Sequence, residues 1–119
     1  MNGVDQIKAR VAQRFHLELA ELESPRRPAH IAFPRQVAMY LVRELTPLSL
    51  EQIAAAFSKR DHGTVLHACR LVERRAEADP TLRGTLADLL ASLRAQLADR
   101  TERRELAHSS VTGDFGGAE

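Results

Sequence analysis

The stretch that decides the fold is SLEQIAAAFSKRDHGTVLHACRLV, residues 49–72. Its first polar residue, Ser49, is followed three positions later by Gln52, the spacing of a capping box at a helix N-terminus. The apolar residues behind this cap recur at helical spacing. They predict a short helix from Leu50 to about Phe57.

A tight turn is expected over residues 58–60, and Asp61 is a typical N-cap for a second, longer helix that ends near Ala78. Two helices joined by a short turn, the second opening with small polar residues, are typical of a helix-turn-helix. The first residues of such a helix reach base edges in the major groove of DNA, and its positive end favours phosphate. Many enzymes contain the same two-helix geometry without touching DNA, so the pattern alone does not decide the function.

Upstream, apolar residues at three- and four-residue spacing predict an amphipathic helix over about residues 4–16, with one or two more helical turns over 17–22. Two prolines within four residues predict a loop over 24–30. Pro34 fits the first turn of a further helix, which should end near Thr46, because the residue before a proline disfavours helical backbone. With no strand pattern in the chain, we expect an all-α fold.

Downstream, Asp79 and Pro80 predict the start of another helix. Its six leucines form the clearest apolar stripe in the chain: Leu82, Leu86, Leu89, Leu90, Leu93 and Leu97. The stripe is more typical of a core face, but it could also pair with a partner protein or with a second copy of the chain. Serine and glycine in the last residues predict a disordered tail over 105–119, which leaves a single domain over 1–104.

The composition excludes several classes of protein. A single cysteine, in a chain of 119 residues, cannot form an internal disulfide, which fits a reducing cytoplasm. No long apolar run or signal-peptide pattern occurs, so a membrane partner is not expected. The aromatic residues are only four Phe and one Tyr, which argues against a base-stacking platform for single strands. We therefore expect a soluble cytoplasmic protein, associated with the nucleoid if it binds DNA.

The charge is unevenly distributed along the chain. Residues 26–75 carry nine Lys and Arg against four Asp and Glu, whereas residues 76–119 carry five against eight. A basic middle beside an acidic end favours contact between the middle and a polyanion, although an unevenly charged solvated surface would look the same.

Catalysis is not expected. His62 and His67 are five residues apart and so do not have the i, i+4 spacing of a metal pair, and Cys69 lies on the predicted apolar face. No carboxylate–histidine–nucleophile set is visible, and we expect no metal and no cofactor.

Residues from about 4 to 97 resemble domain IV, the C-terminal DNA-binding domain of the bacterial replication initiator DnaA. The resemblance rests on Pro34-Arg35-Gln36-Val37-Ala38-Met39, on Ser49-Leu50 with Ile53 and Phe57, and on Arg60-Asp61-His62 followed by Thr64-Val65-Leu66-His67-Ala68. It implies a compact, Trp-repressor-like helical domain that binds DnaA-box sequences in double-stranded DNA and acts in replication initiation or its regulation.

The resemblance also implies a role for each matching residue. Arg27 matches an arginine that enters the minor groove, where a stiff basic loop suits a narrow A/T-rich groove. Asp61 and His62 match base-reading positions in the major groove. The remaining candidates are matches to phosphate-contacting positions, or residues in and beside the turn: Arg35, Gln36, Arg43, Lys59, Arg60, Thr64 and His67.

Two positions depart from the family pattern. Gly63 stands where the family usually has a threonine whose methyl group can meet a thymine methyl, so we expect altered or relaxed preference at one base pair. Phe33 replaces a usual basic residue, so either a phosphate contact is lost or Phe33 acts as a hydrophobic staple on the following helix.

No Gly-x-x-x-x-Gly-Lys-Ser/Thr sequence occurs, so the AAA+ ATPase of a full initiator is not expected here. The chain is then either a stand-alone relative or a fragment. Two roles stay open: a DnaA-box binder that modulates replication or transcription, and a module that tethers a partner protein to DNA.

Overall fold

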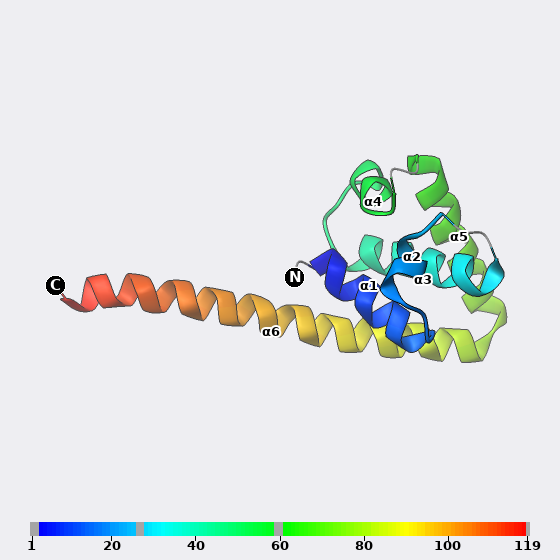
Figure 1. Cartoon of the computed structure of the whole chain (residues 1–119). Helices are drawn as coiled ribbons and strands as arrows, with labels where there is room; N and C mark the ends of the chain where they lie inside the picture. The colour runs from blue at the N-terminus through cyan, green and yellow to red at the C-terminus, as the bar shows by residue number, and fades with distance from the viewer. Residues whose placement is uncertain (1–2, 26–27, 59–60, 119) are drawn as a thin grey trace.

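A computed structural model describes residues 3–25, 28–58 and 61–118, with side chains through Asp99. Within these residues the chain forms six helices and no strand, which confirms the all-α prediction (Figure 1). The helices are α1 (Gly3–Arg14), α2 (Leu19–Glu23), α3 (Ala29–Leu45), α4 (Leu50–Ala56), α5 (His62–Ala78) and α6 (Pro80–Ala118). None of them, within the described residues, has the length and apolar character that a membrane crossing needs.

Helix α3 is the centre of the core, because it packs against each of the other five helices. Its middle residues Val37, Ala38, Leu41 and Val42 are completely buried. The neighbouring helices contribute the apolar faces that their sequence spacing predicted, and fully buried members of those faces are Ile7, Val11, Ile53, Val65, Cys69 and Val72.

The leucine stripe of α6 belongs to the same core. Leu93 is completely buried, and Leu82, Leu86 and Leu89 are at most 9% exposed. Among the described side chains, the one exposed large hydrophobic residue is Leu19. Leu90 and Leu97 are partly buried and pack against this core, so the stripe is mainly an intramolecular packing surface.

The helix caps lie where the sequence predicted them. Ser49 Oγ accepts from Gln52 N at 3.1 Å, and Gln52 Oε1 accepts from Ser49 N at 2.9 Å, which completes the capping box of α4. Asp79 Oδ1 accepts from the backbone N–H groups of Thr81 and Leu82 at the start of α6. These bonds satisfy donors that the first turn of a helix leaves without a partner.

The start of α3 differs from the prediction. The helix begins at Ala29, so Pro34 is its sixth residue and is not in the first turn. The carbonyl oxygen of Pro28 accepts from Ile31 N at 2.9 Å and Ala32 N at 2.8 Å, which makes Pro28 the N-cap. Helix formation through residues 29–33 buries Ile31 completely, and this burial explains why the helix starts before Pro34.

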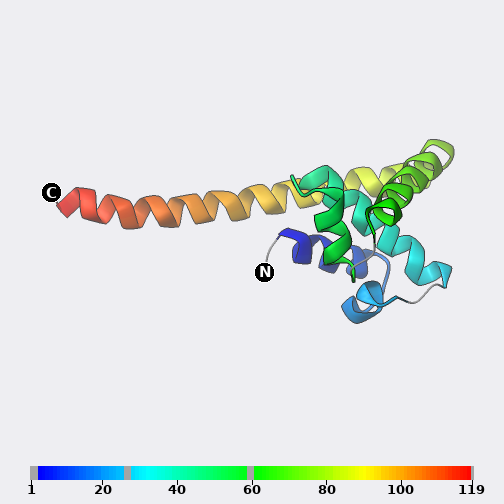
Figure 2. The same cartoon turned by 90° about the horizontal axis from the view of Figure 1, so that it is seen from above.

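The end of the chain is helical in the described backbone. The backbone of α6 continues as helix to Ala118, extending away from the other five helices (Figures 1 and 2). No proline follows Pro80, so no residue in this stretch forces the helix to end. The division into a domain over 1–104 and a separate tail remains a prediction.

The burial of the α6 stripe can be tested by shortening one of its leucine side chains. Leu93→Ala should lower the free energy of unfolding by about 2–5 kcal/mol, because it opens a cavity in a closed core. Leu19→Ala is the matched control, since Leu19 is 38% exposed and should change stability by less than about 0.5 kcal/mol. Urea unfolding of both variants measures the difference; equal midpoints would show that the stripe is not part of the core.

Candidate nucleic-acid interface

Helices α4 and α5 form the helix-turn-helix that the sequence predicted. Ile53, Ala54 and Phe57 are buried beside Val65 and Ala68 of α5, so the angle between the two helices is set by a packed apolar contact. Figure 1 shows α4 and the beginning of α5 on the side of the molecule opposite α6. The N-terminal end of α5 is therefore open to a large partner.

This open end brings together five of the predicted contact residues. Asp61, His62, Gly63 and Thr64 are all exposed, and His67 is exposed one turn further along α5. Asp61 Oδ1 accepts from Thr64 N at 2.9 Å and from Thr64 Oγ1 at 3.3 Å. The first turn is thus held in shape before any ligand arrives, with its polar groups facing outward.

The backbone conformation at residue 63 does not require a glycine. Its φ is not positive, so an L side chain is compatible with the local conformation. A Cβ atom at this position would lie 3.1 Å from Asp61 Oδ1, so the capping carboxylate would have to move by a few tenths of an ångström. Gly63 therefore leaves the surface open at the N-terminal end of α5, and the local fold does not require a glycine there.

A second group of exposed residues continues along α5. Gly63, His67, Arg70 and Arg74 recur at spacings of four, three and four residues, so they share one face of the helix. This face lies opposite the buried residues Val65, Ala68, Cys69 and Val72. Arg70 and Arg74 were missed as candidates in the sequence, although the same spacing would have identified them.

The three candidate contact residues on α3 differ in how exposed their side chains are. Arg35 is only 5% exposed, and its Nε donates to Leu22 O at 2.9 Å. Gln36 is partly exposed and Arg43 is exposed. Arg35 therefore holds the end of α2 against α3, whereas Gln36 and Arg43 are accessible to a ligand. Arg27, Lys59 and Arg60 lie outside the described residues.

Cys69 does not have the environment of a nucleophile. Burial raises the pKa of its thiol, and this effect outweighs a hydrogen bond from Arg43 that lowers it. A buried, protonated thiol is unreactive. Among the side chains that the structure describes, no three His, Cys, Asp or Glu residues are grouped as a metal site would require.

Phe33 does not form the expected staple, because it is the fifth residue of α3 and not a residue that precedes it. Its ring instead lies 4.7 Å from the guanidinium carbon of Arg75, a cation–π contact between α3 and α5. The alternative reading of Phe33, a lost phosphate contact, remains a prediction.

Lys8 is a buried residue that the sequence analysis missed. It is 5% exposed, and its Nζ donates to Glu23 Oε2 at 3.0 Å and to the carbonyl oxygen of Ala56. The position of Lys8 directly after the core residue Ile7 was the available signal, because a lysine at the edge of an apolar face has its stem buried.

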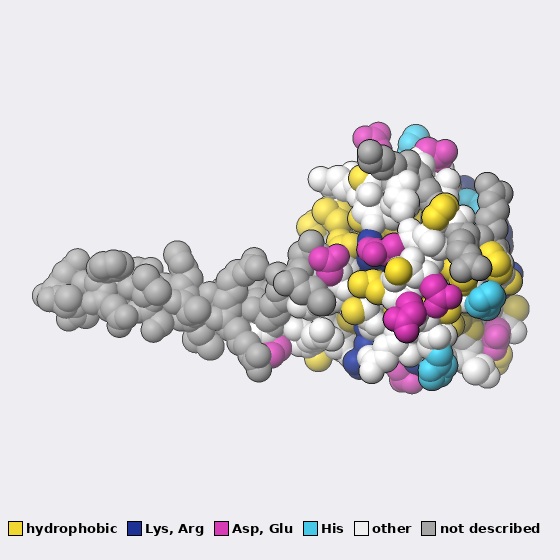
Figure 3. All heavy atoms as spheres, viewed as in Figure 1, with side chains coloured by type: hydrophobic (Ala, Val, Ile, Leu, Met, Phe, Trp, Pro, Cys, Tyr) yellow, Lys and Arg dark blue, Asp and Glu magenta, His cyan; other side chains and the backbone are white. Residues whose placement is uncertain are grey.

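The charged side chains are mixed on the face seen in Figure 3. Asp and Glu lie among the Lys and Arg residues there, so that view shows no continuous basic patch. Of the basic residues counted in 26–75, Arg70 and Arg74 are exposed on one face of α5.

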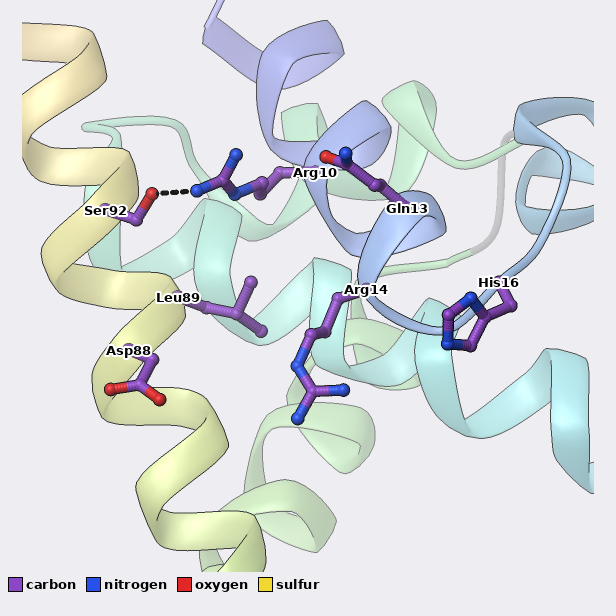
Figure 4. A pocket seen from close by; sticks show the side chains of 7 residues that line it. All are labelled: Arg10, Gln13, Arg14, His16, Asp88, Leu89 and Ser92. Atoms are coloured by element: carbon purple, nitrogen blue, oxygen red, sulfur yellow. Dashed lines mark hydrogen bonds between the residues drawn. The ribbon is translucent and has the colours of Figure 1, made fainter.

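A hollow of about 400 Å³ lies between α1 and α6 (Figure 4). Its cations are already engaged: Arg10 donates to Ser92 Oγ, and Arg14 donates to Thr85 Oγ1 at 3.3 Å. These bonds connect α1 to α6. The lining residues are Arg10, Gln13, Arg14, His16, Asp88, Leu89 and Ser92.

Comparison with solved structures supports the same architecture. A crystal structure of a DNA replication initiation factor is similar with a TM-score of 0.72 at 30% sequence identity. The similarity covers 79% of this chain and 29% of that chain.

Sequence relatives point to the same group of proteins. The chromosomal replication initiator protein DnaA of Symbiobacterium thermophilum is 41% identical over 90 residues, which are 76% of this chain and 20% of the relative. The DnaA protein of Rickettsia bellii is 49% identical over 80 residues, 67% of this chain and 17% of the relative. This chain spans about a fifth of the length of these curated relatives.

The family model described as the bacterial DnaA protein helix-turn-helix matches residues 4–72. This match covers more than half of the chain and includes α4, the turn and α5 as far as Val72. The chain therefore belongs to the bacterial DnaA helix-turn-helix family.

Proposed function

We propose that this chain binds double-stranded DNA at DnaA-box-like sequences and acts in replication initiation or its regulation. The observation that carries this proposal is the open end of α5, where Asp61, His62, Gly63, Thr64 and His67 are exposed together. Such an end fits the major groove, and its N–H groups and partial positive charge suit phosphate.

The two carboxylate oxygens of Asp61 have different roles in this proposal. Oδ1 holds the first turn of α5 through Thr64, and we assign to Oδ2 the role of accepting from a cytosine amino group. His62, beside it, is the second proposed base-reading residue. The hydroxyl of Thr64 can exchange its bond with Asp61 for one to a phosphate oxygen, because one O–H serves either acceptor.

The proposed phosphate contacts flank this reading end. His67, Arg70 and Arg74 follow along the exposed face of α5, and Gln36 and Arg43 are accessible on α3. We propose that Arg35 positions α2 and does not contact DNA, because its guanidinium group donates a hydrogen bond to a carbonyl oxygen of α2. The roles of Arg27 in the minor groove and of Lys59 and Arg60 beside the major groove rest on the sequence resemblance.

A tethering role through the leucine stripe of α6 is not favoured, because four of its six leucines are buried in the core of this chain and the other two are partly buried. A partner protein would have to use another surface.

Selection of bound duplexes from a random pool is the direct test of the proposal. The wild-type chain should enrich DnaA-box-like sequences, with weak preference at the base pair that faces Gly63. Gly63→Thr should strengthen a thymine preference at that one pair, because it adds a methyl group at the reading end. Enrichment of no sequence by the wild type would refute specific binding.

Base reading and phosphate contact can be separated with His62→Ala and Arg70→Ala. His62→Ala should weaken binding to the selected duplex by about 1–3 kcal/mol and leave binding to a scrambled duplex unchanged. Arg70→Ala should weaken both, and reduce the slope of log affinity against log salt by about 1. Arg83→Ala removes the same charge from α6, where Arg83 donates to Ala76 O, and should change neither slope nor affinity. Fluorescence anisotropy across a salt series measures all three.

Arg27→Ala tests the proposed minor-groove contact. Loss of affinity should be largest on duplexes with an A/T-rich block beside the major-groove site, because a narrow minor groove concentrates negative potential. The same affinity loss on A/T-rich and G/C-rich blocks would identify Arg27 as a phosphate contact instead.

A further inference from the structure

Arg75 is an exposed cation where two helices meet. It lies in the last turn of α5, and its guanidinium carbon is 4.7 Å from the centre of the Phe33 ring, near the start of α3. Helices α3 and α5 lie side by side, which brings these two residues together although they are far apart in sequence (Figure 1). The attraction between cation and ring therefore holds the Arg75 guanidinium over α3.

The positive charge of Arg75 is not neutralised by this contact. An aromatic ring attracts a cation through its face but carries no net charge. Among the side chains that the structure describes, the single ion pair joins Lys8 to Glu23, so Arg75 is not paired with any of their carboxylates. A guanidinium has five N–H donors, and stacking on a ring does not use them. Arg75 therefore has a fixed position together with the charge and the donors that bind an anion.

Arg75 lies on the same side of α5 as Thr64, one of the proposed contact residues. The two are eleven residues apart, close to three full turns, which places them about 16 Å apart along the helix axis. The major groove of DNA is about 12 Å wide. When the beginning of an obliquely placed α5 lies in the groove, Arg75 is therefore at the groove edge, where the phosphates are.

The position of Phe33 places this charge beside another proposed contact. Gln36 is partly exposed and comes three residues after Phe33 on α3, and residues at this spacing are neighbours on a helix surface. The guanidinium over Phe33 is therefore within reach of the same part of a duplex as the amide of Gln36. One donor from α5 and one from α3 can then bind the same phosphate or adjacent phosphates.

We propose that Arg75 is a further phosphate-contacting residue and that Phe33 is the residue that positions it. The inference rests on the proposed function, because it assigns one more contact on the duplex that α5 reads. The ligand is the DNA phosphate backbone at the edge of the major groove. Since Phe33 restricts the Arg75 side chain before binding, less side-chain freedom is lost when the phosphate is bound. Position 33 thus contributes to DNA affinity although phenylalanine carries no charge.

Arg75→Gln tests the contact, because it removes the charge and keeps much of the side-chain length. Binding to the selected and to the scrambled duplex should weaken alike, about five- to tenfold at moderate salt, and the slope of log affinity against log salt should fall by about 1. Arg75 is exposed, so the melting temperature should stay within about 4 °C of the wild type.

Arg83→Gln is the matched control for this variant. It removes the same charge beside the end of α5, where Arg83 donates to the carbonyl oxygens of Ala76 and Glu77. Its affinity and its salt slope should both equal those of the wild type.

Phe33→Leu tests the positioning role, because leucine keeps an apolar side chain against the core and lacks the ring. It should weaken binding to both duplexes about two- to fivefold, the strength of an exposed cation–π contact. In the Arg75→Gln background it should have no further effect, since the ring then has no cation to position. Phe33→Lys in that background should restore the salt slope by returning a positive charge to the same place, which a purely structural role of the pair would not do.

Fluorescence anisotropy across a salt series measures all these variants, with Arg70→Ala as the reference for a phosphate contact on the same helix. Wild-type affinity and slope in Arg75→Gln would overturn the phosphate contact. Additive losses from Phe33→Leu and Arg75→Gln in the double variant would overturn the positioning role. If the wild-type chain bound no duplex, the proposed function itself would fail, and this inference with it.

Discussion

The burial of one side of α5 is the constraint on which the structure depends. Val65, Ala68, Cys69 and Val72 are buried against the rest of the core, so the face carrying His67, Arg70 and Arg74 must point outward. Burying four apolar residues of one helix stabilises a small domain by several kcal/mol, on the order of its whole stability. The packing that folds the protein therefore also orients the exposed face of α5 toward solvent.

The polar connections have a different function from the apolar core. Hydrophobic burial brings α2, α3 and α4 together, but apolar contact is non-directional and tolerates sliding. The bonds of Lys8, Arg35 and Ser58 are directional, and each joins residues far apart in sequence. They therefore select one arrangement from the several that the apolar contacts allow.

Much of the fold followed from local sequence patterns, because most of its helices carry their own start and stop signals. The capping box at Ser49, the cap at Asp61 and the stop before Pro47 each act within four residues. The start of α3 could not be predicted in this way. Pro28 and Pro34 are both acceptable near a helix start, and the choice between them depends on the burial of Ile31 in a core that only the whole chain forms.

The candidate site was predicted in part. The residues at the beginning of α5 were identified by the helix-turn-helix pattern and the family resemblance, but Arg35 was expected at the surface and is buried. The sequence could not show this, because the carbonyl groups that Arg35 occupies belong to residues 13 and 14 positions away. The partners of Lys8 lie 15 and 48 residues away, so its role depends on tertiary structure in the same way.

Gly63 has a consequence for how proteins of this kind can diverge. Its backbone is in an ordinary helical conformation, and the nearest obstacle to a side chain is a movable carboxylate. A side chain can therefore replace Gly63 at the start of α5 with only a small shift of Asp61 and no change in the backbone beneath it. Under the proposed function, two domains that share this fold and this core could therefore prefer different base pairs because of this single residue.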